Sequence, residues 1–239
     1  MSLSKNHTKL ITSLRQKKYR QKHKMFVVEG IKVVQEFLQS SFELHLLFSV
    51  DTSYEDQANV IPISDDELKK ISHLVTPNKV LAVFKIPEIQ ELKTSGLILA
   101  LDAINDPGNL GTIIRLCDWF GVTQIVCSND TVDCYNSKVV QASMGSLIRV
   151  PIQYVDLNLF LKETDLPVFI ADMEGGNVYK TTLPEKGILV MGNEANGISN
   201  EIRNMSNHTL TIPRFGEIQK TESLNVATAT AILLSEFRR

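Results

Sequence analysis

The chain has 239 residues, of which 43% are hydrophobic and 22% charged, and its formal net charge is −2 at pH 7. This length suits one large domain or two smaller ones, and the composition is that of an ordinary globular protein. No stretch approaches the ~18 consecutive apolar residues of a membrane span, and the first ten residues lack the apolar core of a signal peptide. We therefore expect a cytoplasmic protein that does not enter the membrane.

The first 24 residues form a basic arm, with eight basic side chains and no acidic one, so the remainder of the chain carries a net charge of −10. A basic segment on an acidic body is a common footprint of a phosphate-binding partner. On charge alone, a solvated helix face explains the pattern equally well. The candidate phosphate ligands are Arg15, Lys17, Lys18, Arg20 and Lys22.

Residues 25 to 86 read as a small α/β unit. Hydrophobic patterning predicts strands over 25–28, 44–48, 60–63 and 80–84, and a helix over 31–38. Ser64 followed by Glu67 is a capping-box arrangement, which predicts a helix over 68–74. The polar stretch that follows, up to Gly96, predicts a linker, so we expect two domains, 1–93 and 94–239.

The second domain contains five apolar runs that alternate with helical segments. They cover residues 97–101, 124–127, 167–171, 188–191 and 209–212. Uninterrupted apolar strands with helical crossovers are typical of a parallel sheet that is covered on both faces. Ligands of such sheets bind beyond the carboxyl ends of the strands, so the polar segments directly after the strands are the candidate sites.

The first such segment, 105–115, follows the strand at 97–101. Pro107 and Gly108 predict a turn, Asn109 is a possible helix cap, and Arg115 lies about two turns into the helix. Asn109 and Arg115 lie near one face only if the helix begins slightly after Asn109. An ordinary strand-turn-helix joint with a surface arginine fits this segment as well.

Two further segments follow strands. In 189–199, Gly192 permits close approach of a ligand to the backbone, Glu194 places a carboxylate at the strand's end, and Ser199 caps the next helix. Residues 211–216 precede a helix of small residues that begins near Ser223. Neither of the first two segments contains Gly-x-Gly-x-x-Gly, which argues against a Rossmann dehydrogenase. Tight packing without a ligand explains each segment taken alone.

Together, the three segments closely resemble the motifs of the SpoU/TrmH family, the ribose 2′-O-methyltransferases of the SPOUT group. The matching residues are Asn109, Gly111 and Arg115 in the first segment, Gly192, Glu194 and Gly197 in the second, and Ile212, Pro213, Gly216, Ser223, Leu224 and Asn225 in the third. Their shared order over about 120 positions makes a chance match very improbable. Residues 26–30 and the unit around them resemble the family's substrate-binding domain, which is similar to a ribosomal-protein-type RNA-binding fold.

The resemblance implies an enzyme that methylates a ribose 2′-hydroxyl of structured RNA, ribosomal rather than transfer RNA, with S-adenosylmethionine as cofactor. It implies a C-terminal SPOUT domain with a trefoil knot, a homodimer, no metal, and an RNA-binding role for the basic arm. The implied cofactor ligands are Met191, Gly192, Ile212 and Leu224. The implied catalytic residues are Arg115, Asn109, Glu194, Ser223 and Asn225.

Arg115 is better suited to stabilising an alkoxide and clamping a phosphate than to acting as a base, because a guanidinium stays protonated. The loop between Ile212 and Leu224 is longer than the usual family spacing, with 217–220 as the extra length, which leaves the place of Ser223 open. A non-catalytic RNA-binding or ribosome-assembly protein of the same fold is the alternative. The three cysteines, Cys117, Cys127 and Cys134, fit neither a zinc site nor a disulfide framework, and we expect buried thiols.

Overall fold

The computed structural model describes residues 3–57, 59–88, 91–92, 94–206, 208–218 and 223–239. The chain divides into two compact units, one made of residues 1–89 and 133–148, the other of 90–132 and 149–239. Residues 133–148 therefore group with the N-terminal part of the chain, although a segment of the C-terminal unit precedes them. Hydrophobic patterning gave no sign of this return. None of the described helices is both long enough and apolar enough to span a bilayer.

The N-terminal unit is built on a four-stranded sheet in the order β1-β4-β2-β3. Strand β4 is antiparallel to both β1 and β2, and β3 lies parallel to β2. The elements are α1 (Lys5–Ser13), α2 (Lys17–His23), β1 (Met25–Glu29), α3 (Ile31–Leu38), β2 (Leu44–Ser49), β3 (Val60–Pro62), α4 (Asp65–Ile71), β4 (Val80–Lys85) and, from the returning segment, α6 (Ser137–Ser143). The four strands and the helix at 31–38 confirm the predictions from periodicity.

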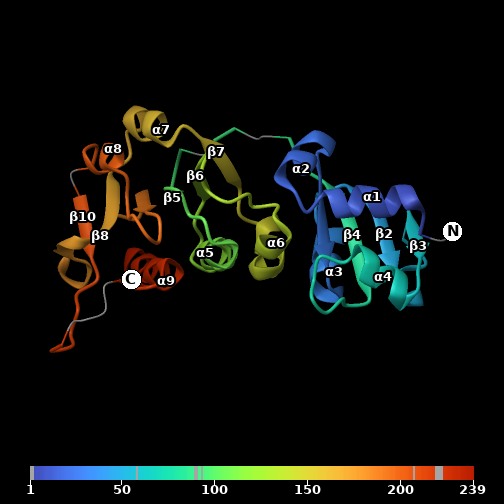
Figure 1. Cartoon of the computed structure of the whole chain (residues 1–239). Helices are drawn as coiled ribbons and strands as arrows, with labels where there is room; N and C mark the ends of the chain where they lie inside the picture. The colour runs from blue at the N-terminus through green and yellow to red at the C-terminus, as the bar shows by residue number, and fades with distance from the viewer. Residues whose placement is uncertain (1–2, 58, 89–90, 93, 207, 219–222) are drawn as a thin grey trace. The chain divides into compact units, whose positions relative to one another are not determined.

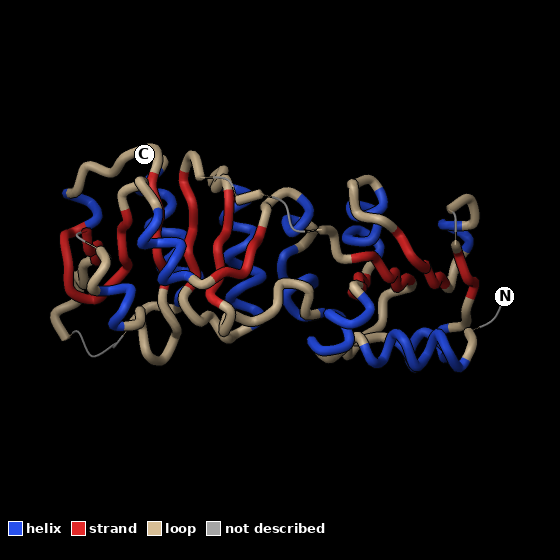
Figure 2. The backbone as a smooth tube through the Cα atoms, turned by 90° about the horizontal axis from the view of Figure 1, so that it is seen from above, coloured by secondary structure: helices blue, strands red, loops and turns tan. Residues whose placement is uncertain are grey.

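Side chains alternate across this sheet, so each face has its own core. On one face, Ile11 and Leu14 of the basic arm pack with Leu68 and Ile71 of α4 in a single buried cluster. On the other face, Phe26 contacts Phe37 of α3 and, at 4.7 Å between ring centroids, Tyr135 of the returning segment. Figure 2 distinguishes the strands from the helices that flank them. The basic arm is thus part of a packed unit.

The capping box at Ser64 is confirmed, but the helix begins earlier than expected. Ser64 Oγ accepts from the Glu67 N–H at 3.2 Å, and the Glu67 carboxylate accepts from the Ser64 N–H at 2.9 Å. Helix α4 accordingly begins at Asp65 rather than at the expected position 68.

Arg20 requires a correction as a candidate RNA ligand. Its side chain is 3% exposed and forms an ion pair with Asp133 at 2.6 Å. The same guanidinium donates to the carbonyl oxygens of Leu14 and Arg15 at 2.8 and 2.9 Å. These hydrogen bonds fix the turn between α1 and α2. Arg20 therefore stabilises the unit, and its guanidinium is not accessible to a phosphate. The ion-pair partner of Arg20 is Asp133. Asp133 lies outside the basic arm, so the charges of the arm alone did not indicate that Arg20 would be buried.

The C-terminal unit contains a six-stranded, entirely parallel sheet in the order β10-β8-β9-β5-β6-β7. Its elements are β5 (Leu97–Leu101), α5 (Pro107–Trp119), β6 (Gln124–Ser128), β7 (Ile152–Val155), α7 (Leu157–Glu163), β8 (Val168–Asn177), β9 (Gly187–Met191), α8 (Asn200–Arg203), β10 (His208–Thr211) and α9 (Val226–Phe237). The five predicted strands are present and the mixed α/β fold class is confirmed. Strand β7 was not predicted, because none of its four residues is fully buried and no apolar run marks it.

Helices cover both faces of this sheet, as the apolar strands require. Helices α7 and α8 pack through Leu157, Leu161 and Ile202 on one face, and α5 and α9 lie side by side on the other. Figure 1 shows these pairs on opposite sides of the strands. Because both faces are covered, only the strand ends are open to a ligand.

Strand β8 contains a five-residue bulge at its carboxyl end. Ile170 pairs with Thr209 of β10, but the next β10 residue, Leu210, pairs with Gly176. Residues 171–175 therefore have no partner in this ladder. A Cβ on Gly175 would lie 2.7 Å from the Thr209 carbonyl oxygen, so the bulge needs glycine there. Bulges of this kind re-aim side chains near functional sites.

Candidate active site

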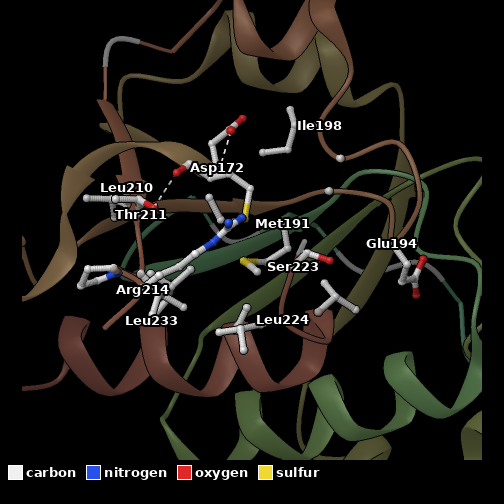
Figure 3. A pocket seen from close by; sticks show the side chains of 18 of the residues that line it. Asp172, Met191, Glu194, Ile198, Leu210, Thr211, Arg214, Ser223, Leu224 and Leu233 are labelled. Atoms are coloured by element: carbon white, nitrogen blue, oxygen red, sulfur yellow. Dashed lines mark hydrogen bonds between the residues drawn. The ribbon is translucent and has the colours of Figure 1, made fainter. Parts of the chain in front are cut away.

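A cavity of about 1150 Å³ lies beyond the carboxyl ends of β8, β9 and β10 (Figure 3). Its position is the one expected for a ligand of a parallel sheet. Apolar side chains of the strands and of α9 form its inner walls, including Met191, Leu210 and Leu233. A smaller cavity shares part of its lining, and both lie within the C-terminal unit.

The loop after β9 forms one wall as a closed ring of backbone. The N–H of Asn193 donates to the Gly197 carbonyl at 2.9 Å, and the Gly197 N–H donates back at 2.9 Å. The Asn193 side chain donates to the Ala103 carbonyl at 2.6 Å and fastens the ring to the loop after β5. A Cβ on Gly192 would lie 2.4 Å from the Gly197 carbonyl carbon, so only glycine fits. The close backbone approach expected at Gly192 is thus made by the chain itself.

One residue of each sequence motif enters a single hydrogen-bond chain. Asn109 Nδ2 donates to Glu194 Oε1 at 2.9 Å, and Asn225 Nδ2 donates to Asn109 Oδ1 at 2.9 Å. The Asn105 N–H points at the other carboxylate oxygen of Glu194 at 3.4 Å. The three side chains line the smaller cavity, and Glu194 also borders the larger one. The arrangement fixes a carboxylate at the boundary of the two cavities.

The start of α5 differs from the expectation that Asn109 caps it. Asp106 is the cap: its Oδ1 accepts from the Asn109 N–H at 2.8 Å, and Pro107 occupies the first turn. Proline is favoured there because its missing N–H would have no helical partner. Asn109 is therefore inside the helix, and Arg115, six positions on, lies on another face. Arg115 is exposed and lines neither cavity.

The other predicted site residues lie at the cavities. Met191, Gly192 and Ile212 line the larger cavity, while Ser223 and Leu224 line both. The loop at 217–220, named for its extra length, lies partly outside the described residues. Asn225 caps α9 by accepting from the N–H groups of Ala227 and Thr228 at 3.0 and 3.2 Å. Its side chain therefore both starts a helix and joins the motifs.

Four charged residues of the larger cavity were not among the predicted site residues: Asp172, Arg203, Arg214 and Glu217. Asp172 lies on the β8 bulge and Arg203 at the end of α8, and the two form an ion pair. Asp172 directly follows the predicted strand at 167–171, so the rule that polar residues after strands form sites would have indicated it. Arg203 stands in α8, where no motif marks it.

The three cysteines are buried thiols outside any disulfide, as expected. Burial raises the pKa of Cys117 well above its usual value, and the nearby Asp118 raises it further. A protonated thiol of this kind is a poor nucleophile. Over the ranges that the structure describes, no three His, Cys, Asp or Glu side chains gather as a metal site would need.

Residues 96–235 match the SpoU rRNA Methylase family, and residues 5–82 match the MRM3-like substrate binding domain. The chain belongs to the SpoU rRNA methylase family. The motif match, the parallel sheet and the joined motif residues are thus features of one SpoU-type catalytic unit.

Relatives of this SpoU protein include the 23S rRNA (guanosine(2553)-2′-O)-methyltransferase RlmP of Bacillus subtilis, 32% identical over 94% of this chain and 93% of the relative. The mitochondrial rRNA methyltransferase 3 of Xenopus laevis is 31% identical over 70% of this chain, which spans only 45% of that longer protein.

Among solved structures, a Porphyromonas gingivalis protein described as a TrmH-family RNA methyltransferase has a TM-score of 0.89 and 39% identity, over 99% of this chain and 98% of that one. An rRNA methyltransferase from Sinorhizobium meliloti with bound AdoMet has a TM-score of 0.87 and 27% identity, over 100% and 97% of the two chains.

Proposed function

We propose that this SpoU protein transfers a methyl group from S-adenosylmethionine to a ribose 2′-hydroxyl of ribosomal RNA. The observation that carries the proposal is the hydrogen-bond chain of Asn109, Glu194 and Asn225. Each comes from a different motif; all three line the smaller cavity, and Glu194 also lines the larger one. A site of this form can present a cofactor from one cavity to a substrate in the other.

The larger cavity fits the cofactor by its chemistry. Apolar walls at Met191, Leu210 and Leu233 suit an adenine ring, and the neighbouring loops offer backbone groups around Gly192 and Ile212. Bound there, S-adenosylmethionine supplies an activated methyl group on a positively charged sulfur. The relative with bound AdoMet supports this assignment.

The protein's own task in this reaction is to hold the hydroxyl and stabilise the charge that appears when its proton leaves. Glu194 is held by Asn109 and can accept a hydrogen bond from the hydroxyl or orient a cation beside it. Ser223, which lines both cavities, can position the ribose or the cofactor. Arg115 carries a fixed positive charge that suits a developing alkoxide or the adjacent phosphate.

Ribosomal RNA as the substrate is supported by the relatives and by the N-terminal unit. RlmP and rRNA methyltransferase 3 are named for ribosomal RNA, and residues 5–82 match a substrate-binding domain. Arg15, Lys17, Lys18 and Lys22 are exposed, which suits phosphate contacts. We assign RNA binding to residues 1–93 with the returning segment 133–148, and catalysis to the rest of residues 94–239.

We further propose a cytoplasmic homodimer with a trefoil knot in its catalytic unit. Arg115 and Trp119 lie one turn apart on α5, and Trp119 is 85% exposed, which suits a surface that a second subunit covers. A subunit contact there would bring Arg115 into a protein interface. Residues 211–218, 223 and 224 line the larger cavity, and we propose that the C-terminal segments of this unit form the knot. Sedimentation of the full chain tests the dimer, and a monomer at micromolar concentration would exclude it.

The deciding experiment is labelled methyl transfer from S-adenosylmethionine to ribosomal RNA that lacks the modification, followed by mapping of the product. We expect label in one 2′-O-methylated nucleotide. Binding of the cofactor without transfer to any RNA would favour the non-catalytic RNA-binding alternative. Calorimetry with NAD as a control should show no binding.

A further inference from the structure

We propose that Asp172, fixed in place by Arg203, accepts a hydrogen bond from the ribose hydroxyls of the cofactor's adenosine. This inference rests on the proposed function, because it assigns one wall of the same cavity. Neither residue belongs to the three sequence motifs. Asp172 is here a cofactor-binding residue, and Arg203 is a positioning residue that acts through it.

The β8 bulge places Asp172 in the cavity wall. Residues 171–175 leave the ladder between β8 and β10, and Ala171, Asp172 and Met173 all line the cavity. Thr211 Oγ1 donates to the Met173 carbonyl at 3.0 Å, which ties the bulge to the end of β10. In Figure 3, the Asp172 side chain lies on the same side of the cavity as Ile198. The bulge therefore gives a carboxylate a defined position at a strand's end.

The carboxylate of Asp172 is held by three groups and keeps room for one more. Its Oδ1 accepts from the N–H groups of Met173 and Glu174 at 2.6 and 3.3 Å, and its Oδ2 faces the Arg203 guanidinium. An ionised carboxylate offers about four acceptor positions, so one remains on Oδ2. The side chain of Asp172 is 14% exposed, whereas that of Arg203 is 43% exposed. The open acceptor thus belongs to the more enclosed partner of the pair.

A ribose suits this acceptor better than the charged amino-acid end of the cofactor. Arg203 already neutralises the carboxylate, so the pair has little preference for an ammonium group. The neighbouring wall is apolar at Met191 and Ile198, which suits the adenosine half of the cofactor, while a strongly hydrated zwitterion favours an open rim. A carboxylate near the end of a parallel strand is also a recurrent partner of ribose hydroxyls in nucleotide sites.

Calorimetry on the full-length protein with three ligands tests this assignment. S-adenosylhomocysteine has both the ribose hydroxyls and the amino-acid end. The ligand 5′-methylthioadenosine has the ribose hydroxyls but no amino-acid end, and its 2′,3′-dideoxy counterpart has neither. Asp172→Asn is the test variant, with Arg203→Ala for the positioning role. Glu174→Gln is the matched control, because Glu174 is exposed on the same bulge and does not line the cavity.

We expect Asp172→Asn to weaken S-adenosylhomocysteine and 5′-methylthioadenosine equally, by about tenfold or more, the usual cost of a hydrogen bond to a charged group. Arg203→Ala should weaken both by a smaller and equal factor. The dideoxy ligand should bind the wild type and both variants alike, which separates loss of a ribose contact from loss of fold. Glu174→Gln should change no affinity by more than about twofold.

Three outcomes would overturn the assignment. Loss of affinity for S-adenosylhomocysteine alone would place the amino-acid end at Asp172. If the variants lose as much affinity for the dideoxy ligand as for the other two, Asp172 and Arg203 have a structural role. If the wild type binds 5′-methylthioadenosine and its dideoxy counterpart with equal affinity, the ribose hydroxyls make no contact with the protein. If the wild type binds none of the three ligands, the proposed function fails instead.

Discussion

Asn109 and Glu194 lie 85 positions apart in the chain, and a 2.9 Å hydrogen bond from the Asn109 amide joins them. Asn225 extends the contact from the third motif. We expect Asn109→Ala to lower methyl transfer by at least about tenfold, because Glu194 and Asn225 both lose a partner. S-adenosylhomocysteine should bind with nearly unchanged affinity. Single-turnover transfer and calorimetry measure the two effects.

Thr112→Ala is the control for Asn109→Ala, since Thr112 is exposed on the next turn of α5 and lines neither cavity. Unchanged transfer by Asn109→Ala would mean that the hydrogen-bond chain only supports the fold.

We expect Arg115 to be needed for methyl transfer but not for cofactor binding. It is exposed and borders neither cavity, so Arg115→Ala should abolish transfer and leave the affinity for S-adenosylmethionine nearly intact. Loss of both would mean a structural role. Arg115→Lys keeps the charge and should retain part of the rate if the residue acts through charge, but little if it clamps a phosphate with two parallel hydrogen bonds.

Gly192 and Gly216 are two motif glycines with opposite surroundings. A Cβ on Gly192 would meet backbone atoms of Gly197 and Ile198 at 2.4 Å, whereas a Cβ on Gly216 would have no atom within 4 Å. Gly192→Ala should therefore destroy cofactor binding and lower the melting temperature. Gly216→Ala should leave the melting temperature unchanged. Similar melting temperatures for the two variants would contradict the ring at 192–197.

Arg20 and Lys18 should act differently although both belong to the basic arm. Removing Arg20 leaves the carboxylate of Asp133 without its ion pair, so Arg20→Ala should lower the free energy of unfolding by about 3 kcal/mol. Lys18→Ala should leave stability unchanged and weaken RNA binding, with a smaller dependence of affinity on salt. Urea denaturation and filter binding at several salt concentrations check both. An unchanged salt dependence in Lys18→Ala would remove that residue from the RNA contact.

His73 makes the stability of the chain depend on pH. The pKa of His73 is lowered from its usual 6.5 to about 4, mainly by burial and also by the charges of Arg15 and Arg20, while the contact with the Ile11 carbonyl opposes the shift. Between pH 6.5 and 4, an unfolded chain binds the proton and the folded chain does not. Stability from this group is therefore present above pH 6.5 and is lost as the pH falls towards 4.

Denaturation of wild type and His73→Gln over this pH range isolates the effect, because Glu29 and the other acids are common to both proteins. The stability advantage of the wild type should shrink as the pH falls. A constant difference would show that His73 does not titrate below its usual pKa in the folded state.

Hydrophobic patterning predicted most of the parallel sheet because its strands are buried on both faces and form unbroken apolar runs. It missed β7, whose four residues are all half-buried. The bulge at 171–175 could not be read from the sequence either, because its length is set by the pairing of Thr209 and Leu210 with residues that lie six positions apart in β8.

In the candidate site too, features set by local sequence were predictable and features set by distant contacts were not. Asn109, Glu194 and Asn225 were identified from motif resemblance, and each lies just beyond a strand or at a helix start, where local rules apply. The absence of Arg115 from the cavity walls follows from the cap at Asp106, which sets the rotation of α5. Arg20 was misjudged because its partner, Asp133, lies 113 residues away.

Residues 133–148 return to the N-terminal unit, with Val139 and Val140 of α6 buried there. Neither unit is therefore one continuous stretch of polypeptide, and a single cut near residue 90 does not yield two finished halves. A shortened protein that begins after the linker would carry α6 with its apolar face exposed to water. Exchange of the N-terminal unit between members of the family, to redirect them to other RNAs, must carry 133–148 along as a second insert.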